Sequence, residues 1–184
     1  MKRDKKVALI CGLIIAIGII ARIVYVNIEH PQVRYQDIAI GKAANWDNNV
    51  ELTVEKTEVY HQEEAIEKYG DDIVDEYDDG DVPFRVIEVQ VLLNNRDESM
   101  QEVYLYDLYI ENRVYSNGIP EEVQYNTEDG ELVLDIQPGE SREVKLCYKV
   151  FDDQVGLSED DEFPVEDFWL SGKHYPVKNR WRLG

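Results

Sequence analysis

The sequence has few of the residues from which disulfide scaffolds, metal centres and nucleophilic sites are built. It contains only two cysteines, and because Cys11 lies in a long apolar run while Cys147 lies in a strand-like segment, they cannot pair within one chain. None of the serines follows the pattern of a nucleophile elbow. The three histidines are far apart and lack the spacing of metal ligands: His30, His61 and His174. The sequence therefore predicts a protein that is not an enzyme and holds no resident cofactor.

Basic side chains are scarce after the first 27 residues. The whole chain has a formal net charge of −20, and residues 28–184 alone carry −24, from 14 basic and 38 acidic residues. A surface of this sign repels nucleic acid and anionic lipids. It favours a basic protein of the cell envelope, a cationic peptide or a divalent cation as the partner. The simplest alternative is that the charge only keeps the protein soluble.

What the sequence has in excess is a long apolar run near its start. Val7–Val26 spans 20 residues and is interrupted by Arg22 alone, and a helix of about 20 residues crosses the hydrocarbon core of a bilayer. Residues 1–6 carry four basic side chains, which favour the cytoplasmic side. These features predict a single-pass anchor in the cell membrane, with a cytoplasmic amino end and an extracellular remainder. Arg22 can reach the headgroups at the outer end and serve as an interface anchor.

Two further hypotheses concern the same run. A cut after Ala21 would make it a cleaved signal peptide, although Ile19 fits the small-residue pattern of a cleavage site poorly. Small residues also recur at four-residue spacing, which would let two such helices approach closely and dimerise. These residues are Ala8, Gly12 and Ala16.

The remaining residues divide into a linker, one domain and a tail. Residues 27–33 form the linker, and residues 34–172 are long enough for a domain with its own hydrophobic core. Residues 173–184 form a basic and aromatic tail, expected to fold back onto the acidic surface or to add an edge strand. A protruding tail that binds a partner is the alternative.

Alternating apolar and polar residues predict that the domain is all-β. This two-residue period is typical of half-buried strands, and its clearest examples are 51–55, 84–93 and 143–150. Several other strand-like runs lie between turn signals, among them a hairpin around Glu128–Gly130. The only helical pattern is an acidic insert at residues 62–81, broken near Gly70. About seven or eight short strands with one helical insert predict an antiparallel immunoglobulin-like β-sandwich.

Two segments of this domain carry a family resemblance. Pro83–Asn95 reads as a long core strand closed by asparagines, and Ile136–Ser141 later leads into the strand that ends at Val150. This order resembles the telokin-like, immunoglobulin-fold extracytoplasmic domains of Gram-positive bacteria, which are families of unknown function. The resemblance covers approximately residues 50–150. It implies the fold and brings no site residues with it.

Two acidic loops form the first candidate site, one in the helical insert and one after Val150. Calcium takes six to eight oxygen ligands, and two converging loops of carboxylates would supply them. The spacing does not follow a helix-loop-helix calcium motif, because Tyr77 and Val86 occupy ligand positions. The candidate ligands are Asp75, Asp79, Asp81, Asp152 and Asp153. A calcium-binding structural domain is therefore the alternative functional hypothesis.

Tyrosines form the second candidate site. The chain contains 12 of them, and four lie close together on adjacent strand-like runs: Tyr104, Tyr106, Tyr109 and Tyr115. Tyrosine is amphipathic and enriched at protein interfaces, although it also fills strand faces in sandwiches. The pattern favours a binding or accessory module, anchored in the membrane, that recognises a protein or peptide at the cell envelope.

Overall fold

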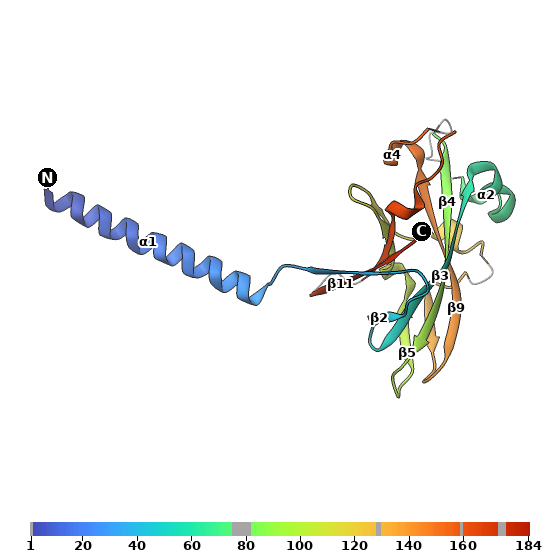
Figure 1. Ribbon diagram of the computed structural model, residues 1–184, viewed down its shortest axis with the longest axis horizontal. Helices are drawn as coiled ribbons and strands as arrows, with labels where there is room; N and C mark the ends of the chain where they lie inside the picture. The colour runs from blue at the N-terminus through green and yellow to red at the C-terminus, as the bar shows by residue number, and fades with distance from the viewer. Residues whose placement is uncertain (1, 75–81, 128–129, 159, 173–175) are drawn as a thin grey trace. The chain divides into compact units, whose positions relative to one another are not determined.

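The computed structural model describes residues 2–74, 82–127, 130–158, 160–172 and 176–184, with the backbone alone for residues 2–11. The chain divides into two compact units, Met1–Arg34 and Tyr35–Gly184. The first unit contains the long helix α1 (Lys2–Glu29), drawn in blue in Figure 1. Its stretch Gly12–Glu29 is long and apolar enough to cross a membrane, as the sequence predicts. The side on which each end lies stays a prediction.

The second unit is an antiparallel β-sandwich with short helices, which confirms the predicted fold class (Figure 1). One sheet has the order β2-β3-β4-β9, formed by Ala44–Asp47, Val50–His61, Phe84–Asn95 and Ser141–Phe151. The other has the order β1-β11-β10-β6-β7, formed by Arg34–Ile38, Val177–Arg182, Trp169–Ser171, Tyr109–Glu111 and Ser116–Asn117. A separate pair joins β5 (Gln101–Tyr104) to β8 (Val133–Ile136). The short helical segments are α2 (Gln62–Tyr69), η1 (Asp71–Ile73), η2 (Leu105–Asp107), α3 (Glu121–Gln124), α4 (Asp152–Val155) and η3 (Val165–Asp167).

Strand β4 is the centre of the first sheet, paired with β3 on one side and β9 on the other. Its alternating residues Ile87, Val89, Val91 and Leu93 all point into the main core. There they meet buried side chains of the opposite sheet, including Ile110 and Leu170. The alternation in the sequence therefore predicted the correct inward face of this strand.

The outer face of the same sheet is covered by the helical insert. Ala65, Tyr69 and Ile73 pack onto Val86 and Cys147 in a second apolar cluster. Gly70 separates α2 from η1 at φ 91°, a conformation that glycine adopts without steric cost, so the predicted break near this residue is confirmed. Because both faces of β4 are covered at its start, residues 84–89 are all buried.

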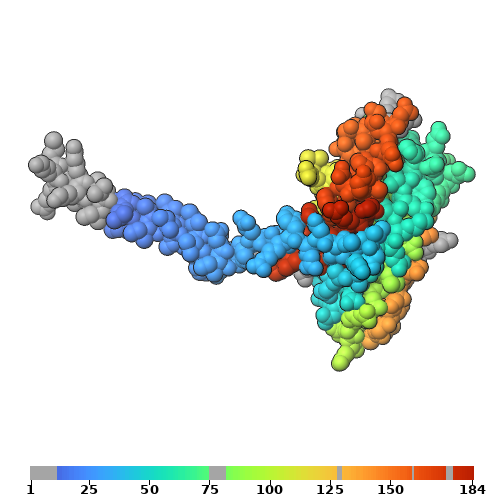
Figure 2. Space-filling model, viewed as in Figure 1, coloured from blue at the N-terminus to red at the C-terminus, as the bar shows by residue number. Residues whose placement is uncertain are grey.

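The segment after residue 172 forms a strand, which was one of the expectations for it, but this strand does not lie at a sheet edge. Residues Val177–Arg182, expected in a tail, form β11 between β1 and β10. Trp181 is fully buried in the core, and Figure 2 shows the C-terminal residues (dark red) packed against the rest of the domain. The sequence pattern did not mark this strand clearly, because three of its six residues are basic: Lys178, Arg180 and Arg182. Residues 173–175 of the predicted tail lie outside the described residues.

The hairpin expected around Glu128–Gly130 is not formed as predicted. Residues 121–124 are helical in α3, and β8 pairs instead with β5. Residues in and near α3 bind the outer edge of β9 through their side chains, and this holds the segment away from a hairpin with β8. The Gln124 side chain donates a hydrogen bond to the Lys145 carbonyl at 2.8 Å and accepts one from the Cys147 N–H at 3.0 Å. Asn117 Nδ2 also donates to the Lys149 carbonyl at 2.9 Å, so side chains close this strand edge.

Candidate functional site

Three of the four predicted tyrosines line a single groove in the second unit. Tyr104, Tyr106 and Tyr109 lie along a hollow of about 580 Å³. The other lining residues are Trp46, Asp47, Val103, Asp107 and Gly172. The groove is therefore built from β2, β5, η2, β6 and the residue that follows β10.

The local backbone explains why these tyrosines face outward together. Val103, Leu105 and Leu108 are buried in the core, and the single turn of η2 lies between β5 and β6. The intervening aromatic side chains are therefore turned toward solvent, where Tyr104 is 37% exposed and Tyr106 is 54% exposed. Their ring centroids are 5.4 Å apart, within the range of favourable aromatic pairs.

Trp46 and Gly172 form the opposite wall through an unusually close approach. A Cβ atom at position 172 would lie 2.6 Å from the indole Nε1 of Trp46, so a larger residue would displace the ring. Trp46 itself is only 7% exposed and packs into the main core. The wall is thus rigid and depends on glycine at this position.

Carboxylates give the groove its charge. Asp47 and Asp107 both line it, and Asp107 is exposed. Tyr104 Oη donates a hydrogen bond to Glu102, and this bond is the main cause of a raised pKa at Tyr104. A surface of aromatic faces beside carboxylates attracts a cation, since both the ring quadrupoles and the negative charges favour it.

The cation nearest to Tyr109 belongs to the protein and is already paired. Lys178 Nζ lies 2.6 Å from Glu111 Oε2 and 5.1 Å from the Tyr109 ring centroid. Burial lowers the pKa of Lys178, but its hydrogen bonds with Glu111 and Tyr109 outweigh burial and raise the pKa overall. Ser171 Oγ donates to the second oxygen of Glu111 at 2.7 Å. In this network the negative charge of Glu111 balances the positive charge of Lys178, and Lys178 also holds Tyr109 in place.

Tyr115, the fourth predicted tyrosine, does not line the groove. Its ring packs edge-on against Phe168, with centroids 6.3 Å apart, and its Oη lies 3.5 Å from the carbonyl oxygen of Lys149. Burial raises the pKa of Tyr115. This tyrosine therefore packs at the edge of the main core beside β9.

The two acidic loops are described only in part. Asp75, Asp79 and Asp81 lie outside the described residues. Among the residues that are described, no group of three or more potential ligands is arranged to hold a metal ion. The calcium hypothesis stays a prediction.

The candidate calcium ligand after β9 already has a cationic partner. Asp152 is buried and forms a two-pronged ion pair with Arg85, with Nε–Oδ1 at 3.0 Å and Nη2–Oδ2 at 3.3 Å. Arg85 is itself only 1% exposed, whereas Asp153, the next candidate ligand in the chain, is exposed. A calcium ion at Asp152 would have to displace this guanidinium.

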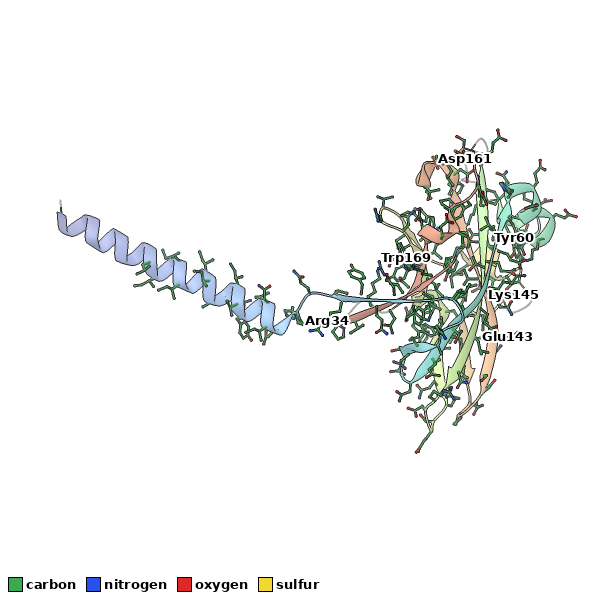
Figure 3. All side chains as sticks on the ribbon, in the orientation of Figure 1. Arg34, Tyr60, Glu143, Lys145, Asp161 and Trp169 are labelled. Carbon is green, nitrogen blue, oxygen red and sulfur yellow. The ribbon has the colours of Figure 1, made fainter. Side chains whose placement is uncertain are left out.

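A second ion pair, between the exposed Lys68 and the buried Glu88, lies under the helical insert. Lys68 Nζ is 2.8 Å from Glu88 Oε2 and donates to Tyr60 Oη at 2.6 Å. Tyr69 Oη donates to the same Glu88 oxygen at 2.6 Å. Figure 3 labels Tyr60 on the side of the sheet that carries α2. The cluster satisfies the one carboxylate on this face of β4 and joins α2 to the sheet.

The predicted membrane residues lie on α1. The guanidinium of Arg22 is 5.6 Å from the ring centroid of Tyr25, whose Oη donates a hydrogen bond to Glu29. This arrangement is compatible with the predicted interface anchor. Helix dimerisation through Ala8, Gly12 and Ala16 stays a prediction.

Residues 29–179 match the family described as "Domain of unknown function (DUF5028)". The chain belongs to this family. The DUF5028 match covers most of the predicted linker and nearly all of the sandwich, and it confirms the predicted resemblance to a β-sandwich family of unknown function. No curated protein matches the chain.

Two solved structures are similar to this DUF5028 chain. The yjhA protein from Bacillus subtilis is 13% identical, with a TM-score of 0.48, and the match covers 79% of this chain and 98% of that one. An uncharacterized beta-sandwich protein from Clostridium difficile 630 is 16% identical, with a TM-score of 0.46, and the match covers 83% of this chain and 97% of that one.

Sequence reasoning missed the wall of the groove. Trp46 stands alone between Asn45 and Asp47, without the periodicity that predicted the long strands, and Gly172 lies far from it in the sequence. Only the pairing of β2 with β3 and of β10 with β6 brings these residues to the tyrosines. Asp107 gave no separate signal because acidic residues are abundant throughout the chain.

Proposed function

We propose that this chain is a membrane-anchored binding module that recognises a protein or peptide outside the cell through the tyrosine groove. The single observation that carries the proposal is the convergence of Tyr104, Tyr106 and Tyr109 on one hollow of about 580 Å³. Ligand pockets have volumes of roughly 300–1,000 Å³ and are lined by aromatic residues with a few polar groups.

The exposure of the tyrosines supports a binding role over a packing role. Tyr104 and Tyr106 flank the buried Leu105 in the chain, yet their own rings stay open to solvent. Tyrosine and tryptophan supply large contact areas at low cost in conformational entropy, which is why they dominate binding hot spots. The helix α1 would hold this groove near the membrane surface, where its partner would also reside.

Site-specific crosslinking tests the proposal in the cells that make the protein. A photoreactive phenylalanine analogue replaces Tyr106 in the full chain, and a matched chain carries it at Tyr125, which is 58% exposed and outside the groove. We expect irradiation to give a discrete heavier product at position 106 only, with the partner identified by mass spectrometry. Absence of a product at 106, or the same products at both positions, would overturn the proposal.

A further inference from the structure

The tyrosine groove continues into a second hollow across a shared wall. The second hollow has a volume of about 400 Å³, and Trp46, Asp47 and Gly172 line both. We propose that the two together bind an extended basic peptide segment, with a lysine or arginine side chain against the tyrosines and the peptide main chain in the second hollow. This inference rests on the proposed function and names the chemistry of its partner.

The tyrosine groove, which is the first of the two hollows, has the chemistry of a site for a cationic side chain. The rings of Tyr104 and Tyr106 are exposed, and the carboxylate of Asp107 lines the same hollow. A lysine or arginine cation over an aromatic face is attracted by the ring quadrupole, most strongly where water is excluded. The protein's own Lys178 does not oppose this, because its charge is matched by Glu111 at 2.6 Å.

The second hollow has the chemistry of a site for peptide main chain. Four carboxamide side chains line it: Gln36, Asn45, Asn48 and Asn179. Each carboxamide offers both donors and an acceptor, the complement of a peptide N–H and C=O. Asn179 Nδ2 donates to the Asn45 carbonyl at 2.6 Å, while its Oδ1 has no hydrogen-bond partner in the described structure. That oxygen is buried, so the carboxamides that a peptide can reach directly are the exposed ones of Gln36, Asn45 and Asn48.

A tight turn presents Asn48 to this hollow. β2 and β3 are joined by two residues, Asn48 at φ 42° and Asn49 at φ 61°. Positive φ at both positions is the signature of the two-residue turns that match strand twist, and asparagine is favoured in them. The turn therefore fixes the position of an amide beside the shared wall.

Charge decides between classes of occupant. Residues 28–184 carry a formal net charge of −24, so they repel nucleic acid and anionic lipid headgroups and attract a basic peptide. An apolar helix would remove water from the exposed carboxylate of Asp107 and from the exposed carboxamides of the second hollow without replacing it, which is costly. An extended basic segment replaces that water with main-chain hydrogen bonds at the amides and with a cationic side chain beside Asp107.

Binding of a defined probe tests the inference. The full chain in nanodiscs of neutral lipid is titrated with a fluorescent hexapeptide of alternating lysine and glycine, followed by fluorescence anisotropy. We expect saturable binding that falls at least tenfold in a Tyr104→Ala/Tyr106→Ala variant and is unchanged in Tyr125→Ala. The same peptide with acetylated lysines should not bind, because acetylation removes the cation.

Two matched pairs separate a specific site from general attraction. Asp107→Asn should weaken binding several-fold, whereas Asp72→Asn, which removes the same charge from an exposed position in η1, should not. Asn48→Gly removes the amide and keeps the turn, because glycine adopts positive φ freely, and it should also weaken binding. Asn49→Gly makes the same change at the neighbouring position, which lines neither hollow, and should leave binding unchanged.

The outcomes distinguish this inference from the proposed function. Equal losses in Asp107→Asn and Asp72→Asn, unchanged binding of the acetylated peptide, or no binding of either peptide would overturn the inference. If crosslinking at position 106 still succeeds, the proposed function stands without it. An Asn48→Gly variant that binds as well as the native chain would remove the main-chain part of the proposal.

Discussion

The indole Nε1 of Trp181 donates a hydrogen bond to the main-chain carbonyl of Leu52 at 3.0 Å, inside the core of the sandwich. Both residues are fully buried. The bond joins β11 in one sheet to β3 in the other, so a strand late in the chain is fixed to one of the longest strands of the opposite layer.

Shortening this side chain should therefore destabilise the whole domain. We expect Trp181→Phe to lower the free energy of unfolding by about 2–4 kcal/mol, because it leaves a cavity and removes a buried hydrogen bond. Denaturant unfolding of the full chain measures the loss. Trp169→Phe is the matched control, since within the described structure its Nε1 has no hydrogen-bond partner, and it should cost clearly less. Equal losses would contradict the role given to the Trp181 hydrogen bond.

Breaking the buried ion pair at the end of β9 should be more costly than removing the adjacent exposed charge. Asp152→Asn leaves the Arg85 guanidinium buried without its counter-charge, and we expect a loss of about 3–5 kcal/mol. Asp153→Asn, at an exposed position, should change stability by less than about 0.5 kcal/mol. Thermal melting of both variants provides the comparison.

The same melting experiment tests the calcium hypothesis. A rise in Tm when calcium is added to the native chain, lost in Asp153→Asn, would support it. An unchanged Tm across millimolar calcium, the concentration range of weak extracellular calcium modules, would contradict it.

The same substitution should have opposite effects at two buried tyrosines. Tyr148 Oη is buried in the core without a hydrogen-bond partner in the described structure, so Tyr148→Phe should stabilise the domain by about 1 kcal/mol. Tyr69 Oη instead donates to Glu88 at 2.6 Å, and Tyr69→Phe should cost about 1.5–3 kcal/mol because the acceptor is charged. The denaturant midpoints of the two variants, compared with the native chain at an unchanged m value, would measure both changes in the free energy of unfolding. A destabilised Tyr148→Phe would contradict the prediction and show that the Tyr148 hydroxyl has a hydrogen-bond partner in solution.

Burial should make the Cys147 thiol unreactive and should make stability fall at alkaline pH. Burial raises its pKa from 9.0 to about 12, so at pH 8 it should react with iodoacetamide only after unfolding, measured in a Cys11→Ser background. Between pH 9 and 12 the unfolded thiol loses its proton while the folded thiol keeps it. The free energy of unfolding should then fall with rising pH by up to about 1.4 kcal/mol per unit from this group. Cys147→Ala should show a shallower decline, and an identical decline would contradict the assignment.

The sequence predicted most where burial is periodic. Ile87, Val89, Val91 and Leu93 alternate without interruption, and this pattern alone identified β4 and its core face. β11 lies in a basic segment that was expected to fold back or to add an edge strand, whereas its position inside the sheet depends on the burial of Trp181 and on pairing with β10. That pairing depends on tertiary context, which local patterns do not encode.

The candidate site was predictable only in part for the same reason. Tyr104, Tyr106 and Tyr109 are neighbours in the sequence, so the sequence pattern was enough to group them. Trp46 and Gly172 are brought to them by strands far apart in the chain. Tyr115 was grouped with the others by proximity in sequence, although its ring packs against Phe168 instead.

The closed edge of β9 bears on how copies of the chain tolerate crowding. Copies held on one membrane, as we propose for this chain, would meet at far higher local concentration than free copies, and open strand edges are where crowded copies aggregate. At β9 the Gln124 and Asn117 side chains occupy the main-chain groups of Lys145, Cys147 and Lys149. Crowded copies of this domain are therefore denied strand exchange at β9, and any protein that contacts this edge has to do so through side chains and not by adding a strand.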